Sequence, residues 1–200
     1  FNLVAQVKSI FISVLNMYFG VVAFFKKKYP IIARGILLVK KKIFHPETVL
    51  QEKREITFYS QFIKKGDLCF DIGANIGNKT NIFLKLGAKV VAIEPQKLAC
   101  QKIEQLYQDN KNLSIVNKGL ADKQGFLELS IGEPCSVLST MSEKWRKEGV
   151  FFEIYTSAKK EKVSVITLNN LISEYGLPKF CKIDVEGFEE QVLKGLSQPI

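Results

Sequence analysis

Short apolar runs alternate with amphipathic stretches along most of this 200-residue chain. Apolar runs bounded by turn residues predict strands at 68–71, 89–93, 113–117, 126–131, 162–167 and 180–184. Helical periodicity predicts helices at 47–63, 79–86, 95–108, 168–175 and 188–196. In helix 95–108 we expect Leu98, Ile103, Leu106 and Tyr107 on the buried side. This alternation predicts an α/β fold with a mostly parallel sheet flanked by helices.

The first part of the chain differs from the rest in being strongly apolar and basic. This pattern predicts a helical segment at 1–45, ahead of a domain at 46–200. Residues 9–25 carry no charge, and three lysines follow at once. This run is at the short edge of what spans a bilayer. The alternatives are a signal-anchor helix, a helix in the membrane interface, and a helix packed on the domain or a partner subunit. We expect a cytoplasmic protein, with membrane contact through residues 1–28 in two of these cases.

Charge is distributed unevenly along the chain. The chain has 29 Lys/Arg and 20 Asp/Glu residues. Residues 1–65 contain 12 of the basic and 3 of the acidic residues, so residues 66–200 contain 17 of each. Enzymes that act on nucleic acid more often carry a basic surface around the active site, so this balance disfavours nucleic acid as substrate. The single histidine, His45, excludes Ser-His-Asp triads and two-histidine metal sites. The four cysteines are far apart, which favours buried free thiols over disulfides or zinc.

The most informative stretch links the first predicted strand to its helix and reads Leu68-Cys-Phe-Asp-Ile-Gly-Ala-Asn-Ile-Gly-Asn-Lys-Thr80. The strand ends in Asp71, and Gly73 and Gly77 allow positive φ and let a ligand press against the backbone. The first N–H groups of the following helix then face that ligand. We predict that Asp71, Gly73, Asn75 and Gly77 bind a cofactor.

The acid in this turn bears on which cofactor binds. A dinucleotide-binding loop reads Gly-x-Gly-x-x-Gly, because the pyrophosphate needs bare backbone and no nearby anion. Here Asp71 occupies the place of the first glycine and suits a positively charged ligand, such as the ammonium and sulfonium of S-adenosylmethionine. Glu94 ends the next predicted strand about 20 residues on, where Rossmann-type folds place the acid that binds ribose hydroxyls. A turn with a capping Asp71 and no ligand is the alternative.

Three motifs carry a resemblance to a known family. They read Asp71-Ile-Gly-Ala-Asn-Ile-Gly77, Ile93-Glu-Pro95 and Lys182-Ile-Asp-Val-Glu-Gly-Phe-Glu189. They are similar to motifs of the FkbM family of class I S-adenosylmethionine-dependent methyltransferases, and the third is the more specific. The resemblance implies a Rossmann-like class I methyltransferase fold with S-adenosylmethionine as cofactor. It also implies that Asp122 borders the adenine; a turn acid without this role is the alternative.

Two carboxylates follow the last predicted strand. Asp184 ends that strand and Glu186 lies two residues on, at the edge where open α/β sheets bind ligands. Crowded carboxylates raise one another's pKa, which makes one of them a proton acceptor. Alternatively they hold a divalent metal with substrate oxygens, cap the next helix, or pair with Lys182. The resemblance favours Asp184 and Glu186 as catalytic residues, and no metal ligand is assigned.

The resemblance implies O-methylation of a hydroxyl on a sugar, polyketide or related metabolite. The expected partner is then a small-molecule hydroxyl acceptor, and a base or metal is required because a hydroxyl is a poor nucleophile. Two other classes stay open: a methyltransferase of nucleic acid or protein, and a non-catalytic member that binds cofactor or partner only. The Asn-Pro-Pro-Tyr signature for base amines is absent, since the last strand runs into Asp184-Val-Glu-Gly187.

Both ends of the sequence lead to one more expectation. A class I methyltransferase has further strands after the helix predicted at 188–196, whereas this sequence stops at Ile200 and starts at Phe1. We expect C-terminal strands, and any acceptor contacts they make, to be missing from it. The polar insert at 132–149 is expected to cover the substrate.

Overall fold

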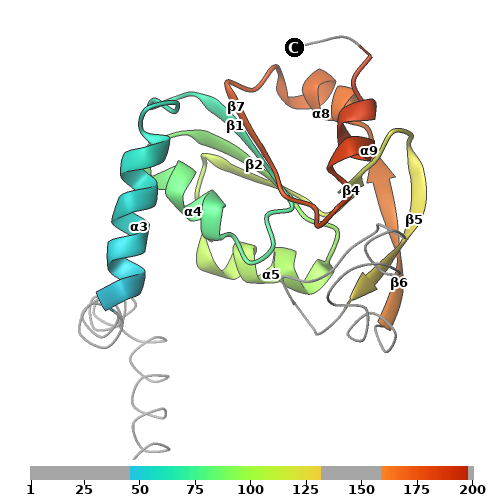
Figure 1. Cartoon of the computed structure of the whole chain (residues 1–200), viewed down its shortest axis with the longest axis horizontal. Helices are drawn as coiled ribbons and strands as arrows, with labels where there is room; N and C mark the ends of the chain where they lie inside the picture. The colour runs from blue at the N-terminus through green and yellow to red at the C-terminus, as the bar shows by residue number, and fades with distance from the viewer. Residues whose placement is uncertain (1–45, 132–158, 198–200) are drawn as a thin grey trace, which may run out of the picture. The chain divides into compact units, whose positions relative to one another are not determined.

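The computed structural model describes residues 46–131 and 159–197 (Figure 1). Its elements are α3 (Pro46–Tyr59), β1 (Leu68–Ile72), α4 (Asn78–Lys85), β2 (Lys89–Ile93), α5 (Lys97–Leu106), β3 (Leu113–Val116), β4 (Gly119–Leu120), β5 (Gly125–Ile131), β6 (Lys159–Ile166), α8 (Leu168–Tyr175), β7 (Phe180–Ile183) and α9 (Glu189–Lys194). The chain divides into two compact units, 1–54 and 55–200. The fold and site below belong to the second unit.

Strand β1 lies inside a four-stranded parallel sheet with the order β3-β2-β1-β7. In this register Asp71 lies beside Ala92 of β2 and Lys182 of β7. Parallel strands present their carboxyl ends at one edge of the sheet, and open α/β sheets bind ligands just outside that edge. The residues that follow β1, β2 and β7 therefore meet there, although they lie far apart in the sequence.

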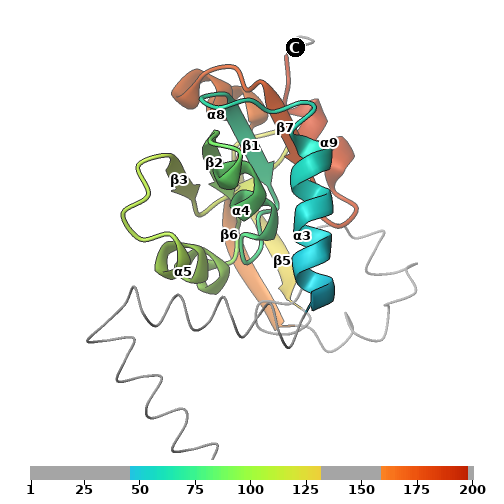
Figure 2. The same cartoon turned by 90° about the vertical axis from the view of Figure 1, so that its left-hand side faces the viewer.

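Helices cover both faces of this sheet (Figures 1 and 2). Successive side chains of a strand point to opposite faces. Phe70 and Ile72 share one apolar cluster with Leu171 of α8. Cys69 lies in a second cluster with Phe83 of α4. Burial on both faces explains why β1 and β2 read as nearly continuous apolar runs in the sequence.

A smaller second sheet has the order β4-β6-β5. Strand β6 runs parallel to β4 and antiparallel to β5, with Glu128 opposite Lys162. Its apolar cluster contains Ala121, Leu129 and Val165. The two-residue strand β4 follows β3 closely in sequence, so this sheet begins where the large sheet ends. It brings Leu129 of β5 to the site described below.

The predicted α/β fold with a mostly parallel sheet flanked by helices is confirmed. Strand β2 and helix α8 have the predicted bounds, and the short strand β4 was not predicted. The other strands and helices differ from their predicted bounds by a few residues at one or both ends. The prediction of free thiols is confirmed for Cys69, Cys100 and Cys181. Burial raises the pKa of Cys69 to about 12, which keeps this thiol protonated and unreactive. Cys135 lies outside the described residues.

The buried face predicted for helix 95–108 is wrong at two positions. Leu98 and Leu106 are 56% and 63% exposed, whereas Ile103 is fully buried. Ala99 and Cys100 are the other buried residues of α5. The prediction followed the largest apolar side chains, but small side chains on the inner face let α5 lie close to the sheet.

Two predictions concern parts of the chain outside the described residues. They are the helical segment at 1–45 and the substrate-covering insert at 132–149. Across residues 46–131 and 159–197, no helix has both the length and the apolar character needed to cross a membrane.

The inner face of α5 gives a matched test of the core. Ile103→Ala should lower the free energy of unfolding by about 2 to 5 kcal/mol, because it removes buried methyl groups and leaves a cavity. Leu106→Ala on the same helix should change it by less than about 0.5 kcal/mol, since that side chain is exposed. Urea unfolding followed by circular dichroism measures both. Equal losses for the two variants would contradict the assigned face.

Candidate functional site

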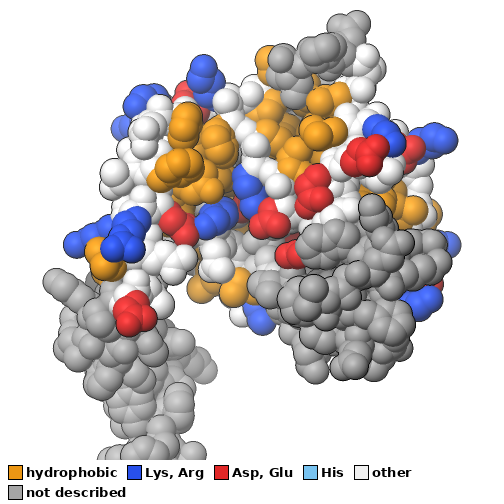
Figure 3. Space-filling view, viewed as in Figure 1, with side chains coloured by type: hydrophobic (Ala, Val, Ile, Leu, Met, Phe, Trp, Pro, Cys, Tyr) orange, Lys and Arg blue, Asp and Glu red, His pale blue; other side chains and the backbone are white. Residues whose placement is uncertain are grey.

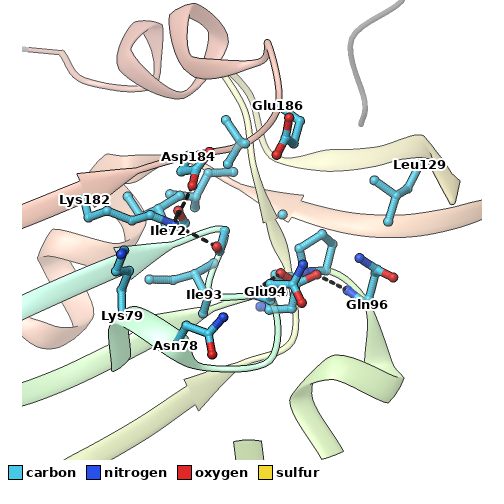
Figure 4. Close-up of a pocket in the computed structure, with 18 residues that line it drawn as sticks. Ile72, Asn78, Lys79, Ile93, Glu94, Gln96, Leu129, Lys182, Asp184 and Glu186 are labelled. Carbon is cyan, nitrogen blue, oxygen red and sulfur yellow. Dashed lines mark hydrogen bonds and ion pairs between the residues drawn. The ribbon is translucent and has the colours of Figure 1, made fainter. Parts of the chain in front are cut away.

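A cavity of about 200 Å³ opens where β1, β2 and β7 end (Figure 4). It is lined by residues from the ends of all three strands, from the start of α4, and from β4 and β5. These residues are Ile72, Gly73, Ala74, Asn75, Asn78, Lys79, Ile93, Glu94, Pro95, Gln96, Lys118, Gly119, Leu120, Leu129, Lys182, Asp184, Val185 and Glu186. The lining mixes backbone, amide and charged groups with a few aliphatic side chains.

The glycine turn after β1 forms one wall of the cavity. Gly73 and Gly77 have φ of +73° and +86°, as the sequence predicts, and Gly77 is the residue that caps α4. The N–H groups of Gly73 and Ala74 both donate to the carbonyl of Ile93, at 3.0 Å. A Cβ on Gly73 would overlap the carbonyl oxygen of Asp184. Only glycine therefore lets the turns after β1 and β7 lie this close together.

Asp71 lies behind this wall and is fully buried. Thr80 of α4 donates its hydroxyl to Oδ2 at 2.6 Å. Among the described residues no group gives Oδ1 a hydrogen bond, and Lys182 Nζ lies 3.4 Å from it. The carboxylate thus joins the strand end to the first turn of α4 and supplies negative charge close to the cavity.

Glu94 stands at the end of β2 with both carboxylate oxygens fixed. Asn75 N–H donates to Oε2 at 2.8 Å and Gln96 N–H donates to Oε1 at 2.9 Å. The residue is only 4% exposed, yet it lines the cavity. Burial raises the pKa of Glu94, although these two N–H bonds and the charge of Lys182 act to lower it. A carboxylate held in this way has lone pairs left for a ligand that donates hydrogen bonds.

The side chain of Asn117 holds the backbone next to Glu94. Its Nδ2 donates to the carbonyls of Glu94 and Pro95, at 3.0 and 2.9 Å. The same atom lies 3.4 Å from the sulfur of Cys100, whose thiol also donates to Glu94 O. This amide fixes the turn that carries Glu94 from the end of β3. Sequence analysis gave Asn117 no such role.

Sequence analysis named Lys182 only as an alternative ion-pair partner of Asp184 and Glu186, and did not predict its contacts with the glycine turn and Asp71. Its ammonium lies 3.4 Å from both Asp71 Oδ1 and Asp184 Oδ2 and donates to the carbonyl of Gly73 at 2.9 Å. Figure 4 shows its side chain reaching from β7 toward Ile72 and Asp184. The available signal was a lysine inside an otherwise apolar strand. That position is hard to interpret until the register places Lys182 beside Asp71.

Asp184 and Glu186 occupy the turn after β7. The side chain of Asp184 is 63% exposed. Glu186 is half-buried and has φ of +53°, a left-handed conformation that is uncommon for a residue with a Cβ. Glu189 braces the turn, since its Oε1 accepts the N–H groups of Val185 and Gly187. Burial, then Asp184 and Glu189, raise the pKa of Glu186, while Lys182 lowers it.

The structure brings five of the eight predicted site residues to the cavity wall. They are Gly73, Asn75, Glu94, Asp184 and Glu186. Asp71 and Gly77 lie behind the wall, and Asp122 is an exposed residue after β4 that is not part of the lining. The residues shortly before Asp122 do line the cavity, namely Lys118, Gly119 and Leu120. Within the described part of the chain, no three His, Cys, Asp or Glu residues form a group that could hold a metal ion.

Comparison with protein families identifies the domain. Residues 71–200 match the family described as "Methyltransferase FkbM domain". This chain belongs to the FkbM methyltransferase family. The match covers most of the chain and includes all three motifs noted in the sequence, so the resemblance is confirmed.

Two solved structures resemble parts of this FkbM chain. One is described as a "putative rRNA-methylase" from Clostridium thermocellum, with 19% identity, a TM-score of 0.31, and coverage of 34% of this chain and 39% of that one. The other is described as a "putative methyltransferase from antibiotic biosynthesis pathway" from Anabaena variabilis, with 20% identity, a TM-score of 0.29, and coverage of 33% and 26%. The FkbM chain thus spans well under half the length of either. A search of curated proteins found no match.

The close approach at Gly73 can be tested by a matched pair of substitutions. Gly66 has φ of +89° with nothing within 4 Å of an added Cβ, so Gly66→Ala should lower the free energy of unfolding by about 1 to 2 kcal/mol through backbone strain alone. Gly73→Ala should lower the free energy of unfolding by about 3 to 5 kcal/mol, because the backbone at Asp184 must also move. Urea denaturation measures both. Equal costs would show that the two turns are not in contact.

Proposed function

We propose that this protein uses S-adenosylmethionine to methylate a hydroxyl group of a small molecule. The observation that carries the proposal is the buried carboxylate of Glu94, fixed by two backbone N–H groups and lining the cavity at the end of β2. Membership of a methyltransferase family supports the reaction class.

The residues at the cavity fit the ribose of this cofactor. Each oxygen of Glu94 accepts one backbone N–H, and a carboxylate oxygen has about two acceptor sites. One further acceptor site on each oxygen is therefore open to the two neighbouring hydroxyls of a ribose. Asn117 keeps this carboxylate in place by holding its backbone.

The charges around the cavity fit a cation better than a pyrophosphate. Asp71, Glu94, Asp184 and Glu186 all lie in or just behind its wall. The lining also contains Lys79, Lys118 and Lys182, and Lys79 pairs with Glu55 at 2.7 Å. The four acids outnumber these lysines, so the cavity disfavours the phosphates of a dinucleotide and favours a sulfonium. Figure 3 shows the face of the molecule seen in Figure 1, where acidic and basic side chains lie side by side near the centre, next to hydrophobic areas.

The bound cofactor would supply an electrophilic methyl group on its sulfonium sulfur. The acceptor oxygen forms a bond to that carbon while the carbon–sulfur bond breaks, and the hydroxyl proton must leave. We assign that proton to Glu186, which lines the cavity and has a raised pKa. Asp184 beside it disfavours a second negative charge and so makes Glu186 the better base. The chain's further contribution is alignment of the acceptor with the methyl group.

The acceptor class follows from the family rather than from the cavity. FkbM-type motifs imply a hydroxyl on a sugar, polyketide or related metabolite. The even charge balance of residues 66–200 also favours a small molecule over nucleic acid.

The role of Glu94 gives a direct test of the cofactor. Glu94→Gln should weaken S-adenosylmethionine binding about 10- to 100-fold, because charge-assisted hydrogen bonds to the ribose are lost. Titration calorimetry with S-adenosylmethionine, S-adenosylhomocysteine and NAD measures this, and Glu104→Gln on the exposed face of α5 is the matched control. Tighter binding of NAD than of the sulfur ligands, or unchanged binding in Glu94→Gln, would refute the cofactor assignment.

The role of Glu186 predicts a pH dependence of methyl transfer. A base acts in its deprotonated form, so the rate should rise with pH through a pKa above the ordinary glutamate value. Glu186→Gln should lower kcat about 100-fold or more and remove this acidic limb. Pre-steady-state methylation of a panel of sugar and polyketide alcohols at several pH values measures both effects. Glu190→Gln, at an exposed position on α9, should keep the wild-type profile; an acidic limb that survives in Glu186→Gln would assign the base elsewhere.

A further inference from the structure

The ammonium of Lys182 lies between two carboxylates of the site. It forms ion pairs with Asp71 and Asp184, both at 3.4 Å. Its charge also reaches Glu94 and Glu186, since it lowers the pKa of each. One cation from β7 therefore acts on acids that follow β1, β2 and β7.

Lys182 is also held firmly in place. Its side chain is only 13% exposed. The ammonium donates to Gly73 O at 2.9 Å and lies 3.4 Å from Ile72 O. A lysine on the surface would move away and be screened by water, but this one keeps its charge beside the cavity.

The proposed cofactor and its product differ in a way that makes such a charge important. S-adenosylmethionine and S-adenosylhomocysteine have the same nucleoside and the same amino-acid group, and they differ by one methyl and one positive charge on sulfur. Contacts with the shared groups cannot distinguish them. The electrostatic field of the cavity can, because it acts on the charge that is lost during the reaction.

We propose that Lys182 sets the preference of this cleft between the sulfonium cofactor and its thioether product, by offsetting part of the negative charge of Asp71, Glu94, Asp184 and Glu186. This inference rests on the proposed function and deepens it. Without Lys182, these four carboxylates would bind the cation more tightly and make the charged ground state too stable. The charge of Lys182 weakens the attraction between these carboxylates and the sulfonium. Less electrostatic stabilisation of the bound ligand is then lost when methyl transfer makes the sulfur neutral.

This specificity role differs from a purely structural role in one measurable respect. If Lys182 only anchored the turn at Gly73, its loss would weaken both ligands by the same factor. If its charge acts on the sulfonium, its loss shifts the ratio of the two dissociation constants in favour of S-adenosylmethionine. The ratio is an equilibrium quantity and needs no acceptor substrate.

The test is calorimetric titration of both ligands into the wild-type protein, Lys182→Met and Lys182→Arg. Lys182→Met should raise the ratio of Kd for S-adenosylhomocysteine to Kd for S-adenosylmethionine about fivefold, the effect of removing one unit charge from a partly screened pocket. Lys182→Arg keeps the charge and should stay within about twofold of wild type. Lys179→Met removes an exposed lysine just before β7 and should leave the ratio unchanged.

A second variant covers the case in which Lys182→Met does not fold. Asp184→Asn removes a negative charge next to Lys182 from an exposed side chain, so the ratio should fall instead of rise. Opposite shifts in the two variants, or this fall alone, support the proposal. An unchanged ratio in every folded variant overturns it while leaving the cofactor assignment intact. A wild-type protein that binds neither ligand overturns the proposed function, and this inference with it.

Discussion

The contact between the turns after β1 and β7 is the constraint on which the site depends. Gly73 lies against the carbonyl of Asp184, and Asp184 N–H donates to Ile72 O at 3.1 Å. This contact continues the parallel pairing of the two strands past their ends. It puts Lys182 within reach of Asp71 and brings Glu186 to the same cavity as the glycine turn. A bulkier residue at 73 would separate the two halves of the site.

Buried charge is the second organising feature. Asp71 and Glu94 are almost fully removed from water, where an uncompensated carboxylate is costly. Each is compensated in a different way: Asp71 by the Thr80 hydroxyl and the Lys182 ammonium, and Glu94 by two backbone N–H groups. Such arrangements are weak evidence for stability, because the desolvation cost can exceed the attraction. Their position at the edge of the sheet is better explained by ligand binding.

Sequence patterns predicted most of the elements, and five of the eight predicted site residues lie at the cavity wall. The apolar runs of β1 and β2 and the turn glycines carry strong local signals, so the placement of Asp71, Gly73 and Glu94 at strand ends followed from spacing. The pairing of Lys182 with Asp71 was not predicted, because it depends on the register of β7 with a strand far away in the sequence. The faces of α5 were misjudged because periodicity alone does not say that Ala99 and Cys100 face the sheet. Asp122 followed from family resemblance, and its role stays a prediction.

The pairing of β1 with β7 also has a consequence for how the domain folds. The bond from Lys182 to Ile72 joins residues 110 positions apart, and closing a loop of that length costs about 4 kcal/mol of chain entropy. As the chain is synthesised, β1, β2 and β3 emerge well before β7. The ion pair between Asp71 and Lys182 cannot form until β7 has been synthesised, and one edge of β1 stays exposed until then. The interaction that completes the site is therefore one of the last to form, and the domain should fold more slowly than its helices alone would suggest.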